Sequence, residues 1–119
     1  MAGLALIAGL LMIALPAPDY DAAMAPYHTA FDAAQGEMVS AGRLNEVHDK
    51  AGTCMALTAA VTDFGNAATA LAPVFTLLAG DSGLDEAKRA GLTAQAQQAK
   101  DTALLNVGSA KADYNRLCG

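Results

Sequence analysis

The sequence predicts an all-α protein, a three-helix up-down-up bundle built on a disulfide-closed helical hairpin. Apolar residues recur at alternating steps of four and three positions, which is the pattern of helices with one buried face. Alanine, the strongest helix former, supplies 29 of the 119 residues. The only two cysteines, Cys54 and Cys118, bracket two segments that can form helical arms of equal length. Together these observations favour closely packed helices around a thin core.

The N-terminal segment differs from the rest of the chain. Residues 2–15 are small or apolar without interruption, and Pro16, Ala17 and Pro18 follow them. Because this order is typical of a secretory signal, we expect residues 1–18 to be a signal peptide and residues 19–119 to be a single helical domain. A short N-terminal anchor is the alternative, although as a helix the apolar run would span only about 20 Å of a hydrocarbon core of roughly 30 Å. The sequence therefore predicts a secreted or periplasmic protein.

The first helix is predicted over residues 26–51. Pro26 fits a helix start, and Gly52 fits a C-terminal cap that is followed by Thr53 as the next N-cap. A break at residues 40–42, around Gly42, is one alternative boundary, and a helix that continues through Gly52 is another. The apolar face of this segment comprises Tyr20, Met24, Tyr27, Phe31, Ala34, Met38 and Ala41.

The second arm should follow Thr53 and end at Gly80, with an interruption at Pro73, which lacks an N–H group. Its predicted apolar face comprises Cys54, Thr58, Val61, Phe64, Ala68, Leu71, Phe75 and Leu78. After a turn signal at residues 80–83, Ser82 and Asp85 resemble a capping box, and Asp85 and Arg89 have the spacing of an i,i+4 ion pair. The third arm then presents Leu92, Ala96, Ala99, Ala103, Val107, Ala110, Tyr114 and Leu117.

The cysteines predict where the hairpin turns. In an exported protein two cysteines are expected to form a disulfide, which brings their Cα atoms within about 7 Å. If straight helices met at a tight turn at Ser82, Cys54 and Cys118 would differ by about 12 Å in their distance from the turn along the helix axes. A wide turn over residues 80–91, ending at an interruption at Gly91, would give equal arms of residues 54–80 and 92–118. The length comparison therefore predicts the wide turn.

Charge limits the classes of partner. The formal net charge is -5, and every charged side chain lies at or after Asp19. An acidic chain with scattered basic residues disfavours nucleic acid and anionic lipid surfaces. We expect no nucleic-acid partner, and we expect membrane contact only if residues 2–17 are an uncleaved anchor.

No arrangement of residues indicates catalysis or a bound metal. His28 and Asp32 are spaced i,i+4, but a zinc site needs at least three converging ligands, and nothing places His48 or Glu46 beside them. Cys118 stands next to the last residue, where no walled pocket is expected. We expect five further carboxylates at exposed or capping positions, which offer no acid–base pair: Asp63, Asp81, Asp85, Glu86 and Asp101. We therefore expect no enzyme activity, no catalytic residues, no metal and no cofactor.

Two functions remain open. The first is a non-enzymatic role through protein contacts, as a structural protein, subunit or adaptor, with a protein partner or by self-association. The second is a carrier of haem or another small hydrophobic ligand, since the first helix carries side chains of the types that ligate haem iron: Met24, Tyr27, His28 and Met38. A carrier should have a cavity beside Tyr27, His28 and Phe31. An interaction protein should have a filled core and an exposed apolar face, which the first helix would supply if it did not fold back on the hairpin.

Overall fold

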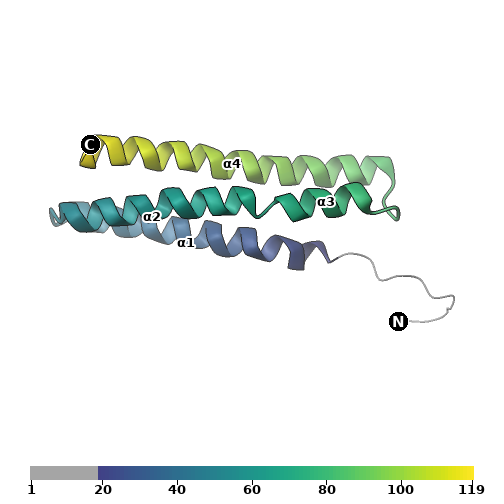
Figure 1. Cartoon of the computed structure of the whole chain (residues 1–119), viewed down its shortest axis with the longest axis horizontal. Coiled ribbons are helices and arrows are strands. Elements are labelled where there is room, and N and C mark those ends of the chain that lie inside the picture. Colours follow the sequence, from purple (N-terminus) through teal and green to yellow (C-terminus); the bar gives the residue numbers. More distant parts are fainter. Residues whose placement is uncertain (1–18) are drawn as a thin grey trace.

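The computed structural model describes residues 19–119, which form four helices and no strands. These are α1 (Tyr20–Glu46), α2 (Lys50–Thr69), α3 (Ala72–Gly80) and α4 (Glu86–Cys118). Figure 1 shows α2 and α3 end to end alongside α4, with α1 on the other side of α2. The all-helical class is confirmed. The expected signal peptide or anchor, residues 1–18, lies outside the described residues, and none of the described helices is long and apolar enough to cross a membrane.

Helix α1 begins before Pro26, so the predicted start at this proline is wrong. The side chain of Asp19 caps the helix by accepting a hydrogen bond from the Ala22 amide at 3.0 Å. Tyr20 and Met24 pack against the core on the N-terminal side of the proline. The cap and this packing stabilise a turn that Pro26 by itself would disfavour.

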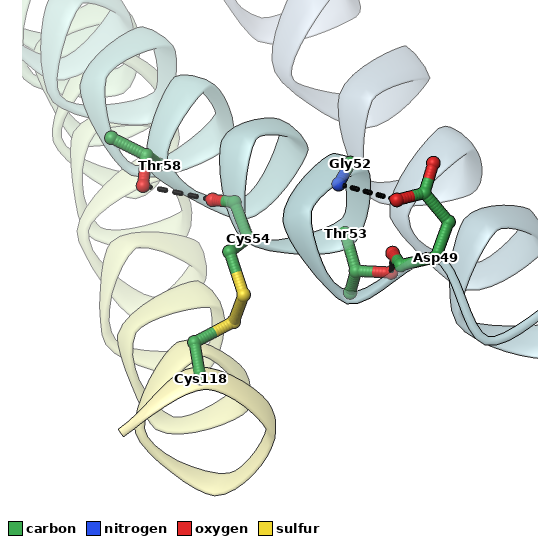
Figure 2. Close-up of a disulfide and its surroundings, with 6 residues drawn as sticks. All are labelled: Asp49, Gly52, Thr53, Cys54, Thr58 and Cys118. Carbon is green, nitrogen blue, oxygen red and sulfur yellow. Dashed lines mark hydrogen bonds between the residues drawn. A yellow bond between two sulfur atoms is a disulfide. The ribbon is translucent and has the colours of Figure 1, made fainter.

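The turn between α1 and α2 occupies residues 47–49 and contains neither of the predicted glycines. His48 supplies the left-handed conformation, with φ of 60°. Asp49, rather than Thr53, is the N-cap of α2, and its carboxylate accepts a hydrogen bond from the Gly52 amide at 2.9 Å (Figure 2). A Cβ at residue 52 would lie 2.5 Å from the Asp49 carboxylate, so the glycine makes room for the cap instead of ending the first helix.

The second arm is interrupted where Pro73 predicts, because α2 ends at Thr69 and α3 begins with Pro73 in its first turn. Its end at Gly80 is also confirmed. Its buried residues continue across the break at alternating four- and three-residue steps, namely Thr53, Leu57, Ala60, Phe64, Ala67, Leu71, Val74 and Leu78. Thr58, which we predicted on the buried face, is exposed. Since α2 packs against both α1 and α4, its buried face is centred between the two contacts and passes through Leu57 and Ala60.

Helix α4 runs unbroken from Glu86, so the predicted interruption at Gly91 and the wide turn are both wrong. The connection from α3 covers only residues 81–85, and Asp85 rather than Ser82 caps α4, accepting from the Lys88 amide at 2.7 Å. The equal-arm argument assumed two continuous helices. The opposite arm is instead broken between α2 and α3, and Asp81 and Asp85 are extended. Extended residues advance about 3.3 Å each, against 1.5 Å in a helix, so the connection at residues 81–85 covers part of the difference in length between the two arms.

Arg89 fixes the α3–α4 turn. Its guanidinium donates hydrogen bonds to the backbone carbonyls of Leu78, Asp81 and Leu84, the last two at 2.9 and 3.3 Å. Its ion pair is with Glu86 at 3.4 Å, not with Asp85 as predicted. The carbonyls at the end of α3, which have no partner within that helix, are thereby satisfied.

The core is thin because alanine recurs on the flanking helices. Ala34 and Ala41 of α1 are buried, and α4 buries Ala96, Ala103 and Ala110 at seven-residue intervals. Aromatic rings fill the space at mid-height, where Phe31 packs edge-to-face on Phe64 with ring centroids 5.2 Å apart and stacks on Tyr27 at 5.5 Å. Alanine lets the helices approach closely, and the aromatic rings fill space that the small side chains leave.

Candidate functional site

The predicted cysteine pair is brought together at the C-terminal end of α4. The sulfur atoms of Cys54 and Cys118 are 2.08 Å apart and their Cα atoms 5.9 Å apart (Figure 2). Cys54 lies in the second turn of α2, and Cys118 is the last residue of α4. The bond therefore joins the α2–α4 pair at the end opposite the turn at residues 81–85.

Next to the disulfide, α2 and α4 form a surface groove of about 370 Å³. We call it the α2–α4 groove, and its lining comprises Thr58, Val61, Thr62, Lys111, Tyr114 and Asn115. Thr58 donates a hydrogen bond to the carbonyl of Cys54 at 2.9 Å, which places one end of the groove a single helical turn from the disulfide (Figure 2). A covalent bond thus holds the two walls of the groove together at that end.

Large apolar side chains remain exposed around the groove. Met55 is 74% exposed and Leu104 49% exposed. They stand seven positions before Thr62 and Lys111 respectively, so each lies on the groove side of its helix. Tyr114, which we predicted on the buried face, is 37% exposed and lines the groove itself. Part of the exposed apolar surface is therefore on the α2–α4 pair, and Val39 of α1 and Val47 just after it are exposed as well.

This location differs from the first helix, which we expected to supply an exposed apolar face only if it did not fold back on the hairpin. α1 does fold back onto α2, so Tyr27 is buried and Phe31 is partly buried against the core. Sequence reasoning missed the groove because it followed only the buried faces of the helices. The available signal was Leu104 and Leu105, two large apolar residues outside the predicted apolar face of the third arm.

The residues proposed for a haem or carrier site do not converge on one cavity. Tyr27 is buried and packs on Phe31, whereas His28 is exposed, with its ring against the edge of Tyr27 at 5.2 Å. A smaller groove of about 160 Å³ lies between α1, α3 and α4. Its lining includes Tyr20 and Met24, and Met24 is one helical turn before His28. That volume is below the roughly 300–1,000 Å³ of typical small-molecule pockets.

The structure separates the histidines considered as metal ligands. His28 lies in the first half of α1, whereas His48 lies in the α1–α2 turn, and both are exposed. Among residues 19–119 no three histidine, cysteine, aspartate or glutamate side chains are grouped closely enough to hold a metal ion. His48 instead lines a pocket of about 280 Å³ at the end of the molecule, together with Asn45, Lys50, Thr53 and Leu117.

One carboxylate pair was missed. Asp81 and Asp85 occupy the turn and the cap of α4, as predicted for capping positions, but Asp63 is half-buried and faces Glu37 of α1. Burial, a hydrogen bond with Asp63 and the charge of Asp63 raise the pKa of Glu37 to about 7. The sequence held a signal for this pair, because Glu37 stands three positions after Ala34 and four before Ala41 and so flanks the buried face of α1.

The chain matches no protein-family model, and comparison with curated proteins and with solved structures likewise finds no significant match.

Proposed function

We propose that the protein is an exported, non-enzymatic helical domain that acts through protein contacts in a structural, subunit or adaptor role. The observation that carries this proposal is the α2–α4 groove, with Met55, Leu104 and Tyr114 exposed along it. Grouped apolar side chains on a surface groove are typical of interaction sites. In the proposed architecture α2 and α3 act as one arm of a three-helix up-down-up bundle, and a partner helix would fill the groove.

The distribution of buried and exposed residues supports contacts over ligand carriage. The aromatic residues that would line a carrier cavity pack on one another, since Tyr27, Phe31 and Phe64 form a continuous stack. Large apolar side chains such as Met55 and Leu104 are instead exposed on the surface. This combination, a filled core with an exposed apolar surface, is the one expected of an interaction protein.

Export is proposed from two features. Residues 1–18 have the order of a signal peptide, and the Cys54–Cys118 pair lies at disulfide distance. N-terminal sequencing of the protein recovered from the medium or periplasm tests the first feature, because an intact Met1 there would rule out cleavage.

A photo-crosslinking experiment tests the contact surface. p-Benzoylphenylalanine replaces Tyr114 in the full chain, and a matched variant carries it at Gln98, an exposed α4 residue on the side away from the groove. We expect a discrete crosslinked species from position 114 and none from position 98, and mass spectrometry distinguishes a second copy from another protein. Equal crosslinking from both positions, or a monomer without adducts in sedimentation velocity at high concentration, would contradict the proposal.

A further inference from the structure

Glu37 of α1 and Asp63 of α2 face each other across the interface between these helices, within hydrogen-bonding reach. The Oε1 atom of Glu37 is shielded from solvent and has no hydrogen-bond partner. The neighbouring core layer is apolar and comprises Ala34, Ala60, Phe64 and Ala110, with Phe31 and Met38 against them. A carboxylate oxygen in this position is poorly solvated and unsatisfied, which is unfavourable for the charged form.

Within residues 19–119, no cation compensates the pair, and Asp63 is the charged group that acts on Glu37. On α1 itself, the positions one turn away from Glu37 are all uncharged: Ala33, Ala34, Ser40 and Ala41. α4 contributes Val107 and Ala110 to this layer, both apolar, and the amide of Asn66 donates to Asp63 at 3.5 Å rather than to Glu37.

The presence of a single proton decides whether the two carboxyl groups attract or repel each other. When one carboxyl is protonated, its O–H donates to the other and satisfies the buried oxygen. When the proton is lost, two negative charges oppose each other in a partly desolvated interface. The pKa of Glu37 is accordingly raised from its ordinary value of 4.5 to about 7, with burial as the largest cause, followed by the hydrogen bond and the charge of Asp63.

The interface that contains this pair has no covalent link. The disulfide joins α2 to α4, whereas α1 is attached to the rest only through the turn at residues 47–49 and through packing. Much of that packing uses small residues such as Ala34 and Ala41. Repulsion between Glu37 and Asp63 therefore acts on a helix that the disulfide does not hold in place.

We propose that the Glu37–Asp63 pair is a pH switch, which holds α1 docked on α2 in mildly acidic solution and loosens it as the solution becomes mildly alkaline. Because the folded protein holds a proton on Glu37 that the unfolded chain has released, the docked form is favoured by falling pH. The contribution is fully present below a pH of about 4.5 and is lost as the pH rises through about 7. This inference does not depend on the proposed function.

The test measures urea unfolding of the full chain at pH 5 and pH 8. A fully buried group with this shift would change the folding equilibrium several-hundred-fold, but Glu37 is partly exposed, so we expect about a tenfold weakening at pH 8. Glu37→Gln should abolish the difference because it removes the titrating group, and Asp63→Asn should reduce it because it removes the like charge but leaves Glu37 partly buried. Asp32→Asn, a matched change at an exposed position of α1, should retain it.

Hydrogen exchange locates the effect. At pH 8, after correction for intrinsic exchange rates, amides of α1 should lose more protection than those of α4. Parallel pH dependence in the wild type and Glu37→Gln would overturn the switch. If the variants fail to fold, an NMR titration of the wild-type Glu37 carboxyl decides: a midpoint near 7 supports the proposal, and one near 4.5 overturns it.

Discussion

Removal of the disulfide should produce the largest loss of stability that any change outside the core can cause. Cys54 and Cys118 are separated by 64 positions in the sequence. In the chain-entropy model, closing a loop of this length stabilises the folded state by about 4 kcal/mol at 25 °C. For a domain of roughly 100 residues, this corresponds to a decrease in Tm of about 20 °C. The loss is a large fraction of the 5–15 kcal/mol that typical domains possess.

The assay compares the oxidised protein, the protein kept in reductant, and the double variant Cys54→Ser with Cys118→Ser, each by thermal unfolding followed by circular dichroism. The reduced protein and the double variant should unfold at similar temperatures, well below the oxidised form. The single variant Cys54→Ser should match the double variant, because the second cysteine has no other partner in the sequence. A decrease of less than about 5 °C in both would refute the loop-closure reasoning, since it would mean that the unfolded chain is not appreciably restrained by the bond.

Substitutions at three further positions test individual contacts by urea unfolding. Arg89→Ala should lower the free energy of unfolding by about 1–3 kcal/mol because the carbonyls at the end of α3 lose their donor. Arg89→Lys should restore only part of this loss, since an ammonium group cannot reproduce the planar, forked donors of a guanidinium. Full rescue by lysine would contradict the role of the guanidinium in this turn. Phe64→Ala, at a residue 2% exposed, should cost about 3–5 kcal/mol, and a loss below 1 kcal/mol would show that the mid-height layer is loosely packed. His48→Gly should stabilise the protein by about 0.5–1 kcal/mol by relieving the positive φ of 60°, and destabilisation would indicate that the imidazole makes a stabilising contact.

The parts of the fold that sequence could predict are those governed by local chemistry. The alternating four- and three-residue spacing of apolar side chains from Tyr20 to Ala41 correctly identified the face of α1 that packs on the core, because side-chain periodicity is a property of the helix itself. Pro73 correctly marked the break in the second arm, since a missing N–H acts at its own position. The expectation that the two cysteines pair correctly indicated that Cys54 and Cys118 meet.

The errors arose where tertiary packing overrides a local signal. Gly91 was expected to interrupt the last helix, but it is exposed with open space around it, so the helix continues through it at a modest cost in propensity. The α1–α2 turn depends on an unusual conformation of His48, which no residue-type rule favours over the nearby glycines. The comparison of arm lengths failed because it assumed two continuous helices. The second arm is interrupted between α2 and α3, and the following turn contains extended residues, which advance further per residue than helical ones.

The candidate site was less predictable than the fold. Glu37 and Asp63 lie 26 positions apart, and their contact depends on how α1 and α2 are aligned, which in turn depends on the turn that was placed incorrectly. The groove has the same origin: Tyr114 was assigned to the core because it follows the buried stepping of α4, but α1 covers only one side of the α2–α4 pair. Individual helices can be predicted from their own residues, whereas exposed faces depend on how many neighbours each helix has.

The position of the disulfide determines how the protein would respond to proteolysis. Residues 54–118 form a covalent ring, so one cut in the turn at residues 81–85 leaves both fragments attached through the sulfur atoms. A cut in the turn at residues 47–49 lies outside the ring and frees α1 from any covalent attachment to α2 and α4. A single cut at residues 47–49 therefore removes the covalent attachment of the first helix, whereas α2 and α4 lose theirs only if the turn at residues 81–85 is cut and the disulfide is also reduced.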